Sequence, residues 1–379
     1  MSGGETALKR TKLTPEHAAL RAVETPALIV DVPVLKANIE AMSASAKRAG
    51  LALRPHAKTH KSPEIASLQI KAGAAGIGCA TVAEAEMLAR RGLPGLLLTA
   101  PQMGTDRFER IAKVNRDHGL TVVVDHARQV EGLAAAMRQG DRTLAVALDI
   151  DVGQLRTGIT DIAEGVRIAR MIAGNPAFAF VGVQGFAGHA QHIPDPQQRR
   201  EAAAAAAQTI RDVASALTSA GLPPTLVTGS GTGTYKQDCE GPYNDLQVGS
   251  YVFMDADYAR IVDRDGLGPA FAPSLFVLAT VVSVNRPGQI TVDAGVKALA
   301  TNGPPPCEFI GAPQGCSYRF AGDEHGIITI PAGAVTPELG DRILIGATHC
   351  DPTVNLHAAY HAIDGNDLAC WPILARYGA

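Results

Sequence analysis

The chain has 379 residues, of which 46% are hydrophobic, and its net charge is −3 at pH 7. This length is enough to bury the core of one large domain and a smaller one. No block of like charge occurs and aromatic residues make up only 4%, which excludes the basic, base-stacking surface of a nucleic-acid-binding protein. No apolar run is long enough to span a bilayer, and residues 1–21 lack the apolar centre of a signal peptide. We therefore expect a cytoplasmic protein.

From about residue 27 to residue 250, short β-rich runs alternate with amphipathic or alanine-rich segments. The predicted strands are 27–30, 52–56, 76–79, 95–99, 121–124, 144–149, 180–185 and 225–228. The predicted helices include 34–48, 82–91, 105–118, 161–173 and 197–220. Strand–helix alternation predicts parallel pairing with crossover helices, and this number of units matches a (β/α)8 barrel of the TIM type. An open, doubly wound sheet is the alternative architecture.

After about residue 268 the helical periodicity ends, and short β-rich runs separated by glycine and proline follow. These runs are 275–284, 289–293, 326–330, 342–345 and 360–363. Such a pattern predicts an all-β domain. The predicted domains are therefore an α/β barrel over 27–268 and a β domain built from residues 1–26 and 269–379.

A basic segment, Arg54-Pro55-His56-Ala57-Lys58-Thr59-His60-Lys61, follows the second predicted strand. A lysine at the junction of a strand and a loop is suited to form a Schiff base with an aldehyde cofactor such as pyridoxal 5'-phosphate (PLP). That bond needs a neutral amine, which the flanking cations favour by like-charge repulsion. Read alone, such a segment is more often a solvated strand end, and the other polar segments weigh against that alternative.

Three further polar or glycine-rich segments, 151–158, 188–192 and 229–234, follow the last three predicted barrel strands. Because the carboxyl ends of the strands carry the active site of such a barrel, we expect these segments to meet near Lys58. The glycines of 229–234 allow backbone N–H groups to approach an anion, and the absence of a P-loop lysine favours a single phosphate. Gly249-Ser250-Tyr251 is a second candidate anion-binding loop.

A candidate metal site lies in the predicted β domain, at His349-Cys350-Asp351-Pro352-Thr353. In an extended or turn conformation His349 and Asp351 point to one side and Cys350 to the other. An imidazole and a carboxylate suit a divalent ion such as Mn²⁺, Mg²⁺ or Zn²⁺, with positions left for water and substrate. A chance pair on a surface loop is the alternative. For Asp323-Glu324-His325-Gly326, a glycine-closed turn and a catalytic cluster are both open.

Together these segments resemble the fold-type III PLP enzymes, which join an alanine-racemase-like barrel to a C-terminal β domain. The resemblance covers nearly the whole chain and is closest to the branch of D-threonine aldolase and 3-hydroxy-D-aspartate aldolase. Its most specific parts are 54–58, 249–255 and 349–353. The related D-serine dehydratases carry a cysteine at the second metal-ligand position, where this chain has Asp351. Phe186 stands where relatives carry a tyrosine, and we expect such departures to affect the substrate range.

The resemblance implies roles for individual residues. Lys58 would bind PLP covalently with His56 beside it, and Arg156 would face the cofactor ring. His192 would be the base for the substrate β-hydroxyl. The implied phosphate-binding residues are Gly231, Thr232, Gly233, Ser250 and Tyr251. The implied metal ligands are His349 and Asp351, with Mn²⁺ as the expected ion.

The implied activity is the retro-aldol cleavage of D-β-hydroxy-α-amino acids, for example D-threonine or D-allo-threonine to glycine and acetaldehyde. The expected substrate is a small amino acid. The two-domain form suggests a homodimer, and composition gives no reason to expect nucleic acid or a membrane as a partner. One alternative is a D-serine or 3-hydroxyaspartate dehydratase or aldolase that uses the same site. A non-catalytic PLP-carrier protein is a more distant alternative, against which the predicted β domain and its metal motif argue.

Overall fold

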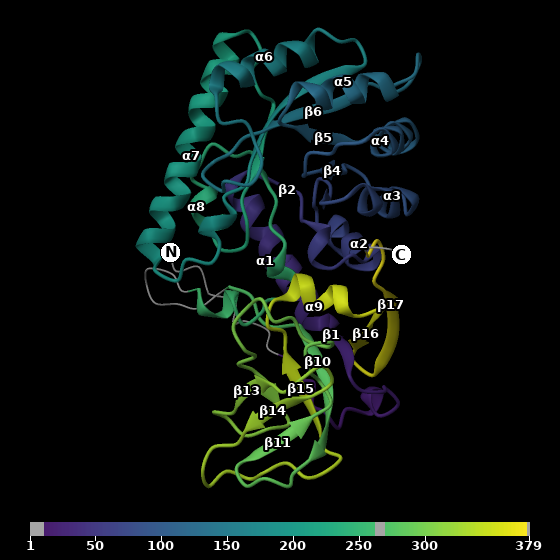
Figure 1. Cartoon of the computed structure of the whole chain (residues 1–379), viewed down its shortest axis with the longest axis vertical. Helices are drawn as coiled ribbons and strands as arrows, with labels where there is room; N and C mark the ends of the chain where they lie inside the picture. Colours follow the sequence, from purple (N-terminus) through teal and green to yellow (C-terminus); the bar gives the residue numbers. More distant parts are fainter. Residues whose placement is uncertain (1–10, 262–269, 377–379) are drawn as a thin grey trace. The chain divides into compact units, whose positions relative to one another are not determined.

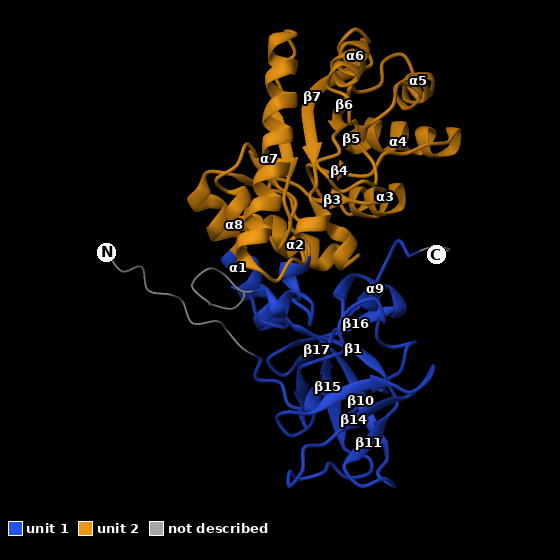
Figure 2. Ribbon diagram, turned by 60° about the vertical axis from the view of Figure 1, so that its left-hand side comes forward, with its two compact units in different colours: residues 1–41, 250–379 blue, residues 42–249 orange. Residues whose placement is uncertain are grey.

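The computed structural model describes residues 11–261 and 270–376. The chain forms two compact units, one made of residues 1–41 and 250–379 and the other of residues 42–249 (Figure 2). The predicted domains, 27–268 and 1–26 with 269–379, include residues 1–10, 262–269 and 377–379, which lie outside the described residues. No helix in the described ranges combines the length and apolar character that crossing a membrane requires.

The unit of residues 42–249 is a barrel of eight parallel strands, which confirms the predicted fold class. The strands are β2 (Ala52–Leu53), β3 (Gly78–Cys79), β4 (Leu97–Leu98), β5 (Thr121–Val124), β6 (Leu144–Asp149), β7 (Phe178–Gly185), β8 (Leu226–Gly229) and β9 (Asp245–Leu246). They pair in the order β2-β9-β8-β7-β6-β5-β4-β3, and a parallel bridge between His56 and Gly78 joins the two end strands. The sheet is thereby closed into a ring.

Helices cover the outside of this ring (Figure 1). They are α2 (Pro63–Lys71), α3 (Val82–Arg90), α4 (Thr105–His118), α5 (Ala127–Ala136), α6 (Ile162–Ala173), α7 (Pro196–Ser219) and the short α8 (Tyr235–Asp238), while α1 (Val32–Ala49) contains the division between the units. Side-chain caps define where several of them begin: Ser62, Thr81 and Asp161 each accept a backbone N–H of the following first turn. These caps fix where α2, α3 and α6 begin after the strands that precede them.

The interior of the barrel combines an apolar layer with one buried ion pair. Leu97, Val123 and Ala147 of neighbouring strands pack together in the apolar layer. Arg54 Nη2 lies 3.0 Å from Oδ2 of Asp245, a residue that is 1% exposed. A buried carboxylate needs such a partner, because removal from water without one is costly. The pair links β9 to the segment that follows β2.

The second unit contains a separate sheet whose strands, within the described residues, are β1 (Ala27–Asp31), β10 (Leu275–Ser283), β11 (Gln289–Val292), β12 (Phe309–Ile310), β13 (Ser317–Phe320), β14 (Gly326–Thr329), β15 (Arg342–Gly346), β16 (Ala359–Asp364) and β17 (Asp367–Pro372). The main order is β13-β14-β11-β10-β1-β16-β17, and β15 pairs with β10 and β12. Its core is formed around Ile29, Phe276, Leu278, Leu344 and Ile363. The predicted C-terminal all-β domain is therefore confirmed.

The prediction that residues 27–30 form the first barrel strand is wrong. Strand β1 pairs antiparallel with β10 and parallel with β16, at the centre of the second sheet. All five of its residues are buried, and such a continuous apolar run is equally typical of a barrel strand and of a central sheet strand. Strand β9 occupies the remaining position in the barrel.

A substitution at Gly76 tests how closely the segments before β3 and β4 approach each other. A Cβ atom at Gly76 would lie 2.0 Å from the Gly95 carbonyl oxygen, so we expect Gly76→Ala to lower the free energy of unfolding by about 2 kcal/mol or more. The matched control is Gly165→Ala in α6, where the nearest atom would be 3.7 Å away and alanine favours the helix. Urea unfolding followed by circular dichroism measures both variants. Equal stability of the two variants would contradict the tight approach.

Candidate active site

Lys58 lies in a single 3-10 turn, Ala57–Thr59, directly after β2 at the rim of the barrel. The backbone N–H of Lys58 donates to Nδ1 of His56 at 3.2 Å, and His56 Nε2 is 2.9 Å from Thr99 Oγ1. Thr99 donates to the Cys79 carbonyl, so it accepts from His56, which corresponds to the neutral Nε2–H tautomer. His56 therefore fixes the backbone of Lys58 and leaves the lysine side chain half-buried.

Two of the cations near Lys58 are paired with buried carboxylates. Nζ of Lys61 lies 2.5 Å from Oε1 of Glu84, whose side chain is 1% exposed, and Arg54 pairs with Asp245. A paired charge repels a neighbouring amine less than an isolated one does. Like-charge repulsion on Lys58 is thus smaller than the sequence alone predicts.

Phe186, which follows β7, brings Lys58 and Arg156 together. The Nζ atom of Lys58 lies 6.0 Å from the centre of the Phe186 ring, and Cζ of Arg156 lies 5.8 Å from it. Both distances are at the limit of cation–π attraction, which is about 6 Å. The two residues that the resemblance assigns to the cofactor therefore both lie near the same aromatic ring.

The loop that carries Arg156 is held at its base by two carboxylates. Thr157 Oγ1 donates to Asp149 Oδ2 at 2.8 Å, and the Gly158 N–H donates to Asp125 Oδ2 at 3.0 Å. Burial raises the pKa of Asp149 to about 6, against the opposing effect of its hydrogen bonds. The loop is thereby tied to the ends of β5 and β6.

Sequence reasoning missed the polar network inside the barrel. Gln184 Nε2 donates to Asp149 Oδ1 at 2.8 Å, and Gln247 Nε2 donates to Gln184 Oε1 at 3.0 Å. Gln247 also donates to Thr228, which in turn donates to Asp245. The sequence signal that could have predicted this network is the occurrence of polar residues at the ends of otherwise apolar strands.

The glycine-rich segment 229–234 follows β8 and packs on Gln191. The Gly233 N–H donates to Gln191 Oε1 at 3.0 Å, and Ser230 has a left-handed φ of 78°. His192, the predicted base, directly follows Gln191 and is half-buried. The predicted phosphate loop thus lies beside the segment that carries His192. One of the N–H groups predicted to bind the phosphate, that of Gly233, is instead hydrogen-bonded within the protein.

The second predicted anion-binding loop begins beside the Lys58 turn. A Cβ atom on Gly249 would lie 2.7 Å from Thr59 Oγ1, so this glycine approaches the turn more closely than another residue could. Ser250 and Tyr251 follow in a 3-10 helix, Ser250–Val252, and both are buried. The Tyr251 ring meets Phe271 edge to face, with centroids 5.5 Å apart.

The predicted metal ligands lie at the start of α9 (Cys350–Leu356), in the other unit. His349 has the expected extended backbone as the N-cap of the helix, whereas Asp351 lies in its first helical turn. Pro352 is compatible with this position, because a first-turn residue needs no N–H partner within the helix. Asn302 Nδ2 lies 2.9 Å from His349 Nδ1. Such a contact can orient an imidazole toward a metal ion.

Cys350 is not suited to be a ligand. Its side chain is buried, and this burial raises the pKa of its thiol. Its N–H donates to Asp255 Oδ2 at 3.0 Å, and its thiol donates to Asp351 Oδ1 at 3.5 Å. The thiol therefore stays protonated.

The donor atoms of both sites fit the groups that the sequence implies. Across the described ranges no cluster of three or more His, Cys, Asp or Glu residues could hold a metal ion, so His349 and Asp351 would act as a pair. Two protein ligands suit an ion that keeps several waters. On the barrel, the fit for PLP rests on the Lys58 amine at the rim and on the Phe186 ring near it.

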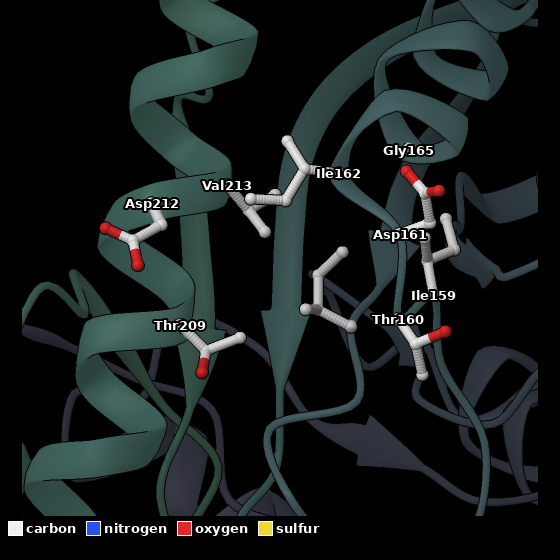
Figure 3. A pocket seen from close by; sticks show the side chains of 9 residues that line it. Ile159, Thr160, Asp161, Ile162, Gly165, Thr209, Asp212 and Val213 are labelled. Carbon is white, nitrogen blue, oxygen red and sulfur yellow. The ribbon is translucent and has the colours of Figure 1, made fainter.

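Two other features lie outside this arrangement. Residues 323–325 belong to the turn between β13 and β14, and Gly326 begins β14. Lys297 Nζ pairs with Glu324 of this turn at 2.5 Å, which favours the turn interpretation. A small pocket of about 120 Å³ lies on the outer side of the barrel, between α6 and α7 (Figure 3). It is lined by Ile150, Ile159, Thr160, Asp161, Ile162, Gly165, Thr209, Asp212 and Val213.

Comparisons with known proteins agree with this arrangement. Residues 30–257 match the model of the alanine racemase N-terminal domain, and residues 274–363 match that of a putative serine dehydratase domain. The chain is 37% identical to the D-threonine aldolase of Arthrobacter sp, with 94% of each covered, and 35% identical to the 3-hydroxy-D-aspartate aldolase of Paracoccus denitrificans (strain Pd 1222), with 93% of this chain and 92% of the relative covered.

Among solved structures, D-threonine aldolase from Filomicrobium marinum superposes with a TM-score of 0.88 at 36% identity, covering 93% of this chain and 95% of that one. This similarity extends over both units, because almost the whole length of each chain is matched. The resemblance found in the sequence is confirmed. The chain therefore belongs to the alanine racemase N-terminal domain family of fold-type III PLP enzymes, in the branch of D-threonine aldolase and 3-hydroxy-D-aspartate aldolase.

Proposed function

We propose that this protein is a lyase that cleaves D-β-hydroxy-α-amino acids by a retro-aldol reaction, giving glycine and an aldehyde. The observation that carries the proposal is the similarity to D-threonine aldolase along 94% of the chain. The grouping of Lys58 and Arg156 around the Phe186 ring supports it. D-threonine and D-allo-threonine, which would both yield acetaldehyde, are the proposed substrates.

Lys58 and Arg156 are the proposed cofactor-binding residues at the centre of the barrel rim. When bound, PLP would supply an aldehyde and an electron sink, and a divalent cation would supply a Lewis acid. Lys58 would hold the aldehyde carbon, with His56 fixing the lysine backbone. Arg156, which cannot give up its proton, would donate to the cofactor ring or the substrate. His349 and Asp351 would bind the cation, for which Mn²⁺ is our first candidate.

His192 is the proposed catalytic base. It would accept the proton of the substrate β-hydroxyl as the Cα–Cβ bond breaks, so that the aldehyde leaves and Cα takes up a proton to give glycine. The phosphate would be held by Gly231 and Thr232, with Ser250 and Tyr251. Because the Gly233 N–H donates to Gln191, Gly233 would shape the loop and not donate to the phosphate.

The second candidate is β-elimination at the same site, which would make the protein a dehydratase. A D-threo-3-hydroxyaspartate dehydratase from Delftia sp. (strain HT23) is 28% identical over 91% of this chain and 95% of that protein. Elimination needs a base for the Cα proton and leaves a 2-oxo acid and ammonia. Asp351, in place of the cysteine of the related D-serine dehydratases, favours the aldolase.

The product of D-threonine distinguishes the two reactions. With protein loaded with PLP and Mn²⁺, we expect acetaldehyde and glycine in equal amounts, loss of activity with EDTA, and no product from L-threonine. Chromatography of the carbonyl compounds measures the outcome. If 2-oxobutyrate and ammonia form instead, the protein is a dehydratase and the aldolase proposal fails.

Lys58 is expected to account for the covalent attachment of PLP. We expect Lys58→Ala to abolish the visible absorbance of the lysine–PLP adduct and to lower kcat by at least about 10³-fold, since it removes the amine nucleophile. The control, Lys47→Ala, removes an exposed lysine of α1 and should keep the spectrum and the rate. Reductive labelling followed by peptide mass mapping locates the attachment. A label on any lysine other than Lys58 would show that Lys58 is not the attachment site of PLP.

His192 and His189 lie three residues apart and form a matched pair. We expect His192→Asn to lower kcat by about 10²–10⁴-fold, the usual contribution of a general base, while PLP absorbance stays unchanged. His189→Asn should cost much less, because His189 is exposed and contacts the loop of residues 151–158 through its own backbone N–H, which the substitution keeps. Steady-state kinetics with D-threonine compare them. An equal loss in both variants would argue that neither is the base.

A further inference from the structure

Gln191 is a buried side chain whose polar atoms all contact the loops around the candidate phosphate site. It is 2% exposed. Its Oε1 accepts the Gly233 N–H at 3.0 Å, and its Nε2 donates to the Ala187 carbonyl at 3.0 Å and to Thr234 Oγ1 at 2.9 Å. One amide group thus links the segment after β7 to the glycine-rich loop after β8.

The same residue explains why the loop contains glycines. A Cβ atom at position 231 would lie 2.3 Å from Gln191 Oε1, and one at position 233 would lie 2.0 Å from the Gln191 carbonyl oxygen. Real Cβ atoms do not approach other heavy atoms so closely. The glycines are therefore required by the packing of the loop on Gln191, whether or not an anion is bound.

Two potential donors of the loop point into the protein. The Gly233 N–H is used by Gln191, and the Thr234 hydroxyl donates to Asp238 Oδ2 at 2.5 Å. Asp238 is buried, and this burial raises its pKa to about 6. An anion at this loop would therefore depend on residues 230–232, whose position follows from the contacts of Gln191.

We propose that Gln191 is a positioning residue that holds the 229–234 loop in the shape that receives the cofactor phosphate. The proposal rests on the proposed function, which places PLP at this rim. Only an uncharged amide serves both sides, because it combines an acceptor for Gly233 with donors for Ala187 and Thr234. A carboxylate would keep the acceptor, lose the donors, and add a negative charge near the phosphate.

The test compares two aldehydes that differ only in the phosphate, PLP and pyridoxal. Their dissociation constants are measured on the full chain from the visible absorbance of the lysine adduct. For Gln191→Glu we expect the preference for PLP over pyridoxal to fall by about tenfold or more, the usual effect of weakening hydrogen bonds to a charged group. The affinity for pyridoxal should change less than about threefold, since pyridoxal makes no phosphate contact.

Two further variants make the test specific. Gln191→Met keeps the side-chain length without adding charge, so it should also lower the preference and carries the test if Gln191→Glu does not fold. The matched control is Asn115→Asp, which changes another buried amide that joins two segments. Asn115 donates to the Arg142 carbonyl and accepts the Leu120 N–H, next to the amino end of β5 and not at the rim that carries the glycine-rich loop. The control should leave the preference unchanged.

The outcomes separate the inference from the proposed function. If wild-type protein prefers PLP but both Gln191 variants lose PLP and pyridoxal equally, Gln191 is only structural and the inference is overturned. If wild-type protein forms no adduct with either aldehyde, the proposed function itself fails, and the inference with it. A preference lost in both Gln191 variants and kept in Asn115→Asp supports both.

Discussion

The closure of the barrel between β2 and β3 is the constraint on which the rim depends. Both strands are two residues long, and they meet through the bridge of His56 to Gly78, with the Gly78 N–H donating to the Pro55 carbonyl at 2.8 Å. The residue that closes the ring also accepts the backbone N–H of Lys58. The position of the proposed catalytic amine is therefore set by the same contacts that complete the sheet.

From that point the loops of the rim support one another. The side chain of Gln154, in the loop of residues 151–158, accepts the His189 N–H. Two residues later, Gln191 accepts the Gly233 N–H of the glycine-rich loop. Gly249 lies against Thr59, in the turn of Lys58. In each contact, backbone atoms of one loop meet a side chain of the next. A site built in this way is preorganised, because its loops need little rearrangement to receive a cofactor.

The sequence predicts the parts of this arrangement that depend on local pattern. Lys58 could be placed at a strand end, and the 229–234 loop at the same rim, because strand–helix alternation fixes where such residues gather. The position of β1 could not be predicted, since a buried run with four successive apolar residues fits either sheet. The helix after His349 was not predicted, because Pro352 is usually taken as a sign against a helix. The roles of Gln191 and Gln184 could not be predicted either, because they depend on contacts between segments that are distant in the sequence.

The sheet of the second unit has a consequence for how the chain folds. Strand β1 is made early in synthesis, but its neighbours β10 and β16 begin only at Leu275 and Ala359. The apolar residues 27–30 of this strand thus lack their partners while the barrel residues are made, and in that interval the edges of the strand are open to wrong pairing. The ribosome-bound chain should therefore be most prone to aggregate before β10 emerges, and a chaperone that binds short apolar segments would act on residues 27–30.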